Sequence, residues 1–210
     1  MSIQSLFIAA LAMAFATLSA RAEPLRIVAL GDSLTAGYGL EPAESFTGQL
    51  EAALKARGHD IVIVNAGVSG DTASDGLARV DWSVGDDADA VIVELGANDA
   101  LRGVDPAITR DALDRILARL GERGIPALLA GMRAPPNLGA AYGAEFDPIY
   151  AELADRHGVV LYPFFLDGVA ADAALNQPDG IHPNAEGVAI IVARILPSVE
   201  ALIEVASAAN

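Results

Sequence analysis

The chain has 210 residues, 53% of them hydrophobic, and it contains no cysteine. This length suits one domain with a well-buried core rather than two domains. The absence of cysteine excludes disulfides, thiolate metal sites and a cysteine nucleophile. The formal net charge of −15 argues against nucleic acid and anionic lipid surfaces as partners, because an acidic surface repels both.

The first 22 residues have the pattern of a secretory signal peptide. Residues 6–18 are almost entirely apolar, and Ala20 and Ala22 form a small-x-small cleavage pattern. The apolar stretch is shorter than the roughly 20 residues that span a bilayer, which argues against a retained anchor. Residues 1–5 carry no Lys or Arg, which departs from the usual pattern. We expect cleavage near Glu23, a mature domain over residues 23–210, and export to the periplasm or, alternatively, to the medium.

Short apolar runs then alternate with segments of helical period. The predicted strands are residues 25–30, 61–64, 91–95, 125–130 and 159–162. The predicted helices are residues 43–57, residues 105–124, a helix through Phe146 and Leu153 that ends at Gly158, and a last helix capped by Asn184.

Several of these elements carry further expectations. The continuous β-branched run 61–64 is typical of a strand buried on both faces. Asp105 and Pro106 form a helix start, and Ile108 begins the apolar face of that helix. Pro197 is expected to kink or restart the last helix. We expect Trp82 to be a core residue or to pack against a helix.

Repeated strand–helix alternation predicts a single-domain α/β fold with three layers, in which helices cover both faces of a five-stranded parallel sheet. In such sheets ligands bind beyond the carboxyl ends of the strands. Residues able to take part in chemistry follow the predicted strands there. These residues are Ser33, Gly67, Asn98, Asp179 and His182.

Ser33 is a candidate nucleophile, and it needs a positioned base because a serine hydroxyl reacts poorly at neutral pH. His59 and His157 stand at helix ends, where a cation suits the helix dipole, so both are interpreted as structural. His182 lies in a loop three residues after Asp179. That spacing lets the carboxylate accept the proton of one ring nitrogen while the other takes the proton of the serine. The alternative is an Asx-turn beside a surface histidine.

Gly67 and Asn98 are candidates for an oxyanion hole, which must stabilise the charge that develops on a carbonyl oxygen. A glycine lets the backbone approach a substrate closely, and an asparagine offers an amide N–H. A tight turn at Gly67 and an Asx-turn at Asn98 remain the alternatives.

The chain resembles the GDSL, or SGNH, hydrolase family over nearly the whole mature region. The matching blocks are Gly31–Leu34, Asn65–Asp71, Gly96–Asp99 and Asp179–Pro183. By this resemblance Ser33 is the nucleophile, and His182, oriented by Asp179, is the general base and then the acid. The backbone N–H groups of Ser33 and Gly67 and the side chain of Asn98 form the oxyanion hole.

Further blocks resemble the exported thioesterase–lysophospholipase–arylesterase branch of the family in bacteria. They are residues 93–103, residues 132–137 and Leu161–Phe165. The resemblance implies a flavodoxin-like fold and hydrolysis of esters and acyl thioesters with no cofactor. It also places Ser69–Thr72 beside the acyl pocket. We expect a small-molecule ester or acyl substrate, no metal and no obligate protein partner.

Three alternatives stay open at this point. A carbohydrate O-deacetylase would use the same residues on acetylated sugars, although the chain has only one Trp and four Tyr to stack on sugar rings. An exported binding protein would keep the fold without the chemistry. A flavodoxin-like cofactor carrier is disfavoured because no G-x-G-x-x-G stretch follows the first strand. Polyanionic acyl-CoA suits this acidic chain less well than neutral esters or zwitterionic lysophospholipids do.

Overall fold

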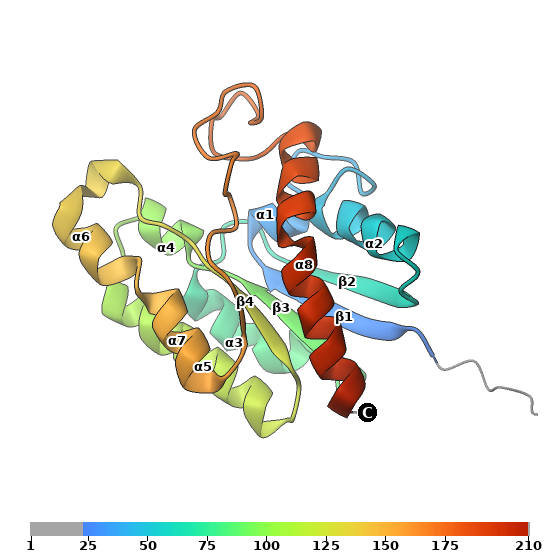
Figure 1. Ribbon diagram of the computed structural model, residues 1–210. Coiled ribbons are helices and arrows are strands. Elements are labelled where there is room, and N and C mark those ends of the chain that lie inside the picture. Colours follow the sequence, from blue (N-terminus) through green and yellow to red (C-terminus); the bar gives the residue numbers. More distant parts are fainter. Residues whose placement is uncertain (1–22, 210) are drawn as a thin grey trace, which may run out of the picture.

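The computed structural model describes residues 23–209, so the predicted signal peptide lies outside the described residues (Figure 1). Five parallel strands form one sheet in the order β2-β1-β3-β4-β5. The strands are β1 (Leu25–Gly31), β2 (Ile61–Gly67), β3 (Ala90–Glu94), β4 (Ala127–Ala130) and β5 (Val160–Tyr162). The predicted α/β class with a five-stranded parallel sheet is confirmed.

Helices cover both faces of this sheet. They are α1 (Ser33–Ala36), α2 (Phe46–Ala56), α3 (Ala73–Ser83), α4 (Ala97–Leu101), α5 (Pro106–Glu122), the 3-10 helix η1 (Pro136–Leu138), α6 (Gly139–Phe146), α7 (Ile149–His157) and α8 (Ala185–Ala209). On one face α2 packs against α8, and on the other α5 packs against α3 and α7 (Figure 1). No helix within residues 23–209 is long and apolar enough to cross a membrane.

The interior strands of the sheet, β1, β3 and β4, form most of its buried core. Every residue of β3 is buried, as is β1 from Ile27 onward. The prediction that residues 61–64 are buried on both faces is wrong, because Val62 and Val64 are only half-buried. The reason is position, since β2 lies at the edge of the sheet and pairs with β1 alone.

Helix starts largely follow the cap residues of the sequence. Asp105 accepts a hydrogen bond from the N–H of Ala107, as predicted for the start of α5. Helix α3 was missed, because few apolar residues mark its buried face. Its capping box, in which Thr72 and Asp75 bond reciprocally, was the available signal.

Other expectations about the helices are corrected. Ile108 and Trp82 are 52% and 73% exposed, so neither is a core residue. Thr109, the neighbour of Ile108, takes the fully buried position at the start of α5. Pro197 does not restart the last helix, because α8 runs through it without interruption.

The predicted helix through Phe146 and Leu153 is two helices. Helix α6 ends at Phe146 and α7 begins at Ile149, directly after Pro148. Proline lacks the N–H that would continue a helix, so the chain turns there. Gly158 ends α7 in the left-handed conformation, as predicted.

Arg79 of α3 joins the carboxyl ends of two strands to the loop that follows β2. Its guanidinium donates to the carbonyls of Gly31 and Ala66, each at 2.8 Å, and to Asp71 Oδ2 at 2.6 Å. The Arg79 side chain is 8% exposed and that of Asp71 14% exposed. A buried cation with acceptors on two strands and on the following loop therefore stabilises this edge of the sheet.

Replacing Arg79 with Met should lower the free energy of unfolding by about 3 kcal/mol, because it leaves a largely buried carboxylate and two carbonyls without their donor. Urea unfolding followed by circular dichroism measures this. Arg115→Ala is the matched control, since Arg115 pairs with Asp111 in solvent and should cost less than about 1 kcal/mol. Equal losses in the two variants would contradict this role of Arg79.

Candidate active site

The register of the sheet brings the ends of three strands level. Gly31, the last residue of β1, pairs with Gly67 of β2 and with Glu94 of β3. Helix α1 starts at Ser33 immediately beyond this line, and α4 carries Asn98 just after β3. The segment between β5 and α8, drawn in orange, approaches the same edge and supplies Asp179 and His182 (Figure 1).

The structure brings the predicted serine, histidine and aspartate together. Ser33 Oγ lies 2.9 Å from His182 Nε2, and His182 Nδ1 lies 2.7 Å from Asp179 Oδ2. Asp179 Oδ1 accepts the backbone N–H groups of His182 and Ile181, each at 3.0 Å.

These hydrogen bonds keep the carboxylate of Asp179 ionised. The bond from the backbone of His182, and then that from its side chain, lower the pKa of Asp179 to about 2. An ionised Asp179 holds the imidazole proton on Nδ1. This leaves Nε2 free to accept the proton of the serine hydroxyl.

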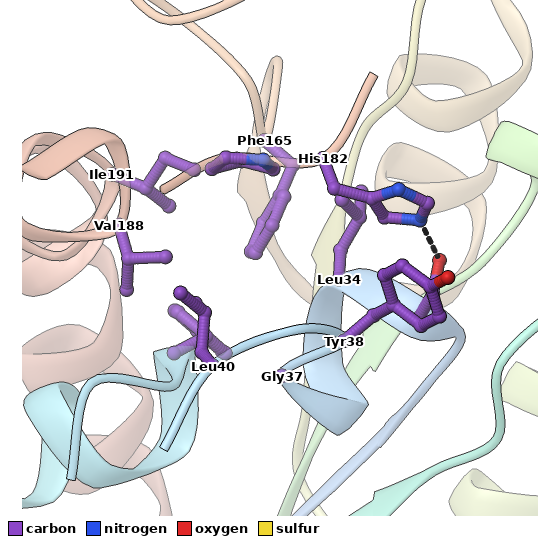
Figure 2. A pocket seen from close by; sticks show the side chains of 11 residues that line it. Leu34, Gly37, Tyr38, Leu40, Phe165, His182, Val188 and Ile191 are labelled. Atoms are coloured by element: carbon purple, nitrogen blue, oxygen red, sulfur yellow. Dashed lines mark hydrogen bonds between the residues drawn. The ribbon is translucent and has the colours of Figure 1, made fainter. Parts of the chain in front are cut away.

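Tyr38 is a neighbour of the histidine that the sequence analysis did not identify. Its ring lies against the imidazole of His182 with centroids 4.6 Å apart (Figure 2). Behind both rings, Leu34, Phe165 and Ile191 enclose an apolar gap of about 10 Å³, which is too small for a substrate group. This packing supports the imidazole from behind.

The other two histidines lie outside the site, as expected. His157 Nε2 lies 2.7 Å from Asp114, and His59 Nε2 lies 3.4 Å from Glu200. Neither lines the space around Ser33.

The prediction for Gly67 is contradicted by the geometry. Gly67 does not line the pocket beside Ser33, and its N–H donates to Asn65 Oδ1 at 3.0 Å. Its Cα packs so closely on α1 that a Cβ would lie 2.3 Å from the nitrogen of Ala36. The glycine is needed for this close packing rather than for donating to a substrate.

Gly70, three residues further on, has the properties that were expected of Gly67. It lines the pocket beside Ser33, and its N–H has no acceptor among residues 23–209. The N–H of Ser33, at the start of α1, has none within these residues either. Gly70 lies inside the block Asn65–Asp71, three residues beyond the glycine that was predicted.

Asn98 lines the same pocket, and its amide is fixed by two acceptors. Nδ2 donates to Asp32 Oδ2 and to the carbonyl of Asp71, each at 3.0 Å. Asp32 Oδ1 in turn accepts the N–H of Leu34 at 2.9 Å, as an N-cap of α1. One buried carboxylate thus joins the helix of the serine to the asparagine.

A second buried carboxyl lies against the first. Glu94, at the end of β3, accepts the hydroxyl of Thr35 at 2.7 Å and the N–H of Asp32 at 3.4 Å. Burial raises the pKa of Asp32 to about 6, and burial followed by the charge of Asp32 raises that of Glu94 well above its usual range. The pair therefore retains a proton at pH values where exposed carboxyls are ionised.

Beside Ser33 a pocket of about 720 Å³ opens to the surface, with a lining that is mostly apolar. The apolar lining includes Leu101, Met132, Pro135, Phe164, Leu166 and Ile181, and Ser69 and Gly70 border it as the resemblance implies. Within residues 23–209 no group of three or more His, Asp or Glu side chains is arranged to hold a metal ion.

A serine paired with histidine and aspartate, at the carboxyl edge of a parallel sheet and beside an apolar pocket, defines a serine hydrolase of the α/β class. Comparison with known proteins agrees. Residues 29–190 match the GDSL-like Lipase/Acylhydrolase family, and the chain belongs to that family.

Three relatives illustrate the match. Esterase TesA of Pseudomonas aeruginosa is 35% identical over 92% of this chain and 96% of its own length. Thioesterase 1/protease 1/lysophospholipase L1 of Escherichia coli is 37% identical over 76% of each chain. The crystal structure of AlinE4, an SGNH-hydrolase family esterase, superposes with a TM-score of 0.73 at 49% identity, covering 85% of this chain and 96% of AlinE4. The prediction of an SGNH ester hydrolase is confirmed.

The raised pKa of Asp32 predicts a pH-dependent loss of stability. Between about pH 4 and pH 6 the folded chain keeps a proton that the unfolded chain releases, so Asp32 lowers stability as the pH rises through this window. Relative to Asp32→Asn, the free energy of unfolding of the wild type should fall by at most about 1.4 kcal/mol per pH unit there. Urea unfolding at pH 4, 5.5 and 7 measures the difference, and parallel pH profiles would contradict it.

Proposed function

We propose that the protein hydrolyses esters through an acyl-enzyme in which Ser33 is the nucleophile. Ser33 Oγ attacks the ester carbonyl while His182 Nε2 takes its proton, and the imidazolium then protonates the departing alcohol. His182 then takes a proton from water, the resulting hydroxide attacks the acyl carbonyl, and the imidazolium returns the proton to Ser33 Oγ as the acyl–Ser33 bond breaks and the carboxylic acid leaves. The observation that carries this proposal is the 2.9 Å contact between Ser33 Oγ and an imidazole that Asp179 orients from 2.7 Å.

The same proposal assigns the oxyanion hole to the N–H groups of Ser33 and Gly70 and to the amide of Asn98. All three residues line the pocket, and both backbone N–H groups lack an acceptor among the described residues. Asp32 fixes one proton of the Asn98 amide. The other, which now points at the carbonyl of Asp71, is shared with the developing oxyanion in the transition state.

The substrate class follows from the pocket. About 720 Å³ with a mostly apolar lining suits the acyl chain of an ester, whereas an acetyl group would fill little of it. This favours esters with longer acyl chains over the acetylated sugars of an O-deacetylase. The names of relatives as an esterase and as a thioesterase and lysophospholipase support carboxylic esters, including lysophospholipids, with thioesters as a further class.

Export of the mature domain is part of the proposal. It is supported by the apolar stretch 6–18 and the cleavage pattern at Ala20 and Ala22. We place the domain in the periplasm rather than the medium, acting on a small-molecule substrate with no obligate protein partner. Cytosolic acyl-CoA is then an unsuitable substrate, because an exported domain does not share its compartment.

Ser33→Ala should abolish both turnover of p-nitrophenyl butyrate and labelling by a fluorophosphonate probe, because each requires the activated hydroxyl. Release of p-nitrophenolate and gel fluorescence measure the two effects. Ser207→Ala, at an exposed position of α8, is the control and should behave like the wild type. Full turnover by the folded Ser33→Ala variant would end the proposal.

Asn98→Ala should lower kcat by about 10²- to 10³-fold with a smaller change in KM, because the donor acts mainly on the charge of the transition state. Steady-state kinetics on the same ester measures the split. A rise in KM with kcat unchanged would show instead that Asn98 binds the ground state.

A further inference from the structure

The distribution of cations around the pocket differs from that in the rest of the molecule. Ion pairs with Asp or Glu occupy nearly every described arginine and the described lysine. Within residues 23–209 the exceptions are Arg102 and Arg133. Both lie at the pocket beside Ser33. Arg133 lines this pocket, and Arg102 donates to the carbonyl of Gly70, a second residue of the lining. Cations without a carboxylate partner therefore gather at this one place.

Arg133 is the freer of these two cations. It is exposed and follows β4, and its guanidinium carbon lies 4.9 Å from the ring centroid of Phe164. This is a cation–π contact, which holds the guanidinium plane but uses none of its N–H donors. Asp147 packs beside the same segment, but its carboxylate accepts the N–H of Ala134 and forms no ion pair with Arg133. The donors of Arg133 have no acceptor within the described part of the chain.

The net charge of the protein indicates what Arg133 could bind. With a formal net charge of −15, the protein repels anions at long range. The ionised Asp179 adds a negative charge next to His182. A neutral ester has no need of an unpaired cation at the pocket. An ester that carries an anionic group does, because only a local positive charge offsets the repulsion.

We propose that Arg133 binds an anionic oxyacid group on the alcohol side of the substrate while the acyl chain fills the apolar pocket. A guanidinium donates two parallel hydrogen bonds to a carboxylate or a phosphate, and the ring of Phe164 holds it in place to do so. The preferred substrate is then an amphiphilic ester with an apolar acyl chain and a phosphate or carboxylate beyond the ester bond. This inference rests on the proposed function and adds the chemistry of the leaving group.

The test compares matched esters on the wild type and on Arg133→Gln. The neutral reference is phenyl octanoate, the carboxylate arm is 4-octanoyloxybenzoate, and the phosphate arm is octanoyl lysophosphatidylglycerol, each below its critical micelle concentration. Relative to its kcat/KM on the neutral ester, the kcat/KM of the variant on the acidic esters should fall about 10-fold or more. A loss of this size is expected when a hydrogen bond to a charged group is removed. Comparing ratios between the proteins cancels the different reactivities of the esters.

Arg133→Lys should recover part of the loss, because it restores the charge but not the two-pronged geometry. Arg115→Ala removes the same charge far from the pocket and should leave the ratios unchanged. Sodium chloride at 0.5 M should narrow the preference of the wild type. A loss on the phosphate arm alone would identify a phospholipid-like substrate, and a loss on the carboxylate arm alone a carboxylated one. Both outcomes support the assignment.

Equal loss on neutral and acidic esters, or no loss on either, would overturn the assignment. As a control for folding, the midpoint of thermal unfolding of Arg133→Gln should equal that of the wild type. Failure of the underlying function has a different signature, since a wild type that hydrolyses none of these esters would refute the role of Ser33 and not the role of Arg133.

Discussion

The site depends on one buried carboxylate. Asp32 caps the helix that begins with Ser33, and its other oxygen holds the amide of Asn98 from a different helix. Because Asp32 is fully buried, both of its oxygens must be satisfied by protein donors. One donor is the N–H of Leu34, next to Ser33, and the other is the amide of Asn98. Glu94 supports it from below by accepting the N–H of Asp32 and the hydroxyl of Thr35. The distance between serine and asparagine is thus determined by the protein interior.

The histidine reaches this interior from 149 residues away along the chain. The segment that carries it follows the edge strand β5, where the sheet no longer determines its course. Local bonds replace the sheet: Asp179 accepts two backbone N–H groups of its own turn, and the N–H of Gln177 donates to the carbonyl of His182. The ring of Tyr38 then covers the imidazole from the side of α1. Only the ring nitrogen that faces Ser33 remains available for proton transfer.

Charge is arranged on two scales in this molecule. Over the surface, most of the described arginines are paired with carboxylates, and the excess of acidic residues keeps the net charge strongly negative. At the pocket, Arg133 lies over Phe164 and has no ion pair with any residue in the range 23–209. The field of the whole chain therefore acts against anions at long range, while the pocket offers them a fixed donor at short range. Such an arrangement selects by the group beyond the ester bond rather than by acyl length alone.

The sequence by itself determined the class of fold and the positions of the strands, and it predicted that Ser33, His182 and Asp179 lie together. These follow from short-range rules: apolar runs that need burial, caps such as Asp105, and the local turn that joins Asp179 to His182. The block Asn65–Asp71 was also evident, although Gly67 was predicted as the donor and it is Gly70 that lines the pocket. Both glycines suit a tight turn, and the sequence does not show which N–H has already found an acceptor.

Tertiary structure decided the rest. The position of β2 at the sheet edge left Val62 half-buried. Trp82 is exposed because α3 turns that face to solvent. The burial of Asp32 and the lack of an ion pair at Arg133 within residues 23–209 likewise depend on neighbours that are distant in the chain. A local sequence pattern does not predict solvent accessibility or charge pairing of this kind, because both arise only after the chain has folded.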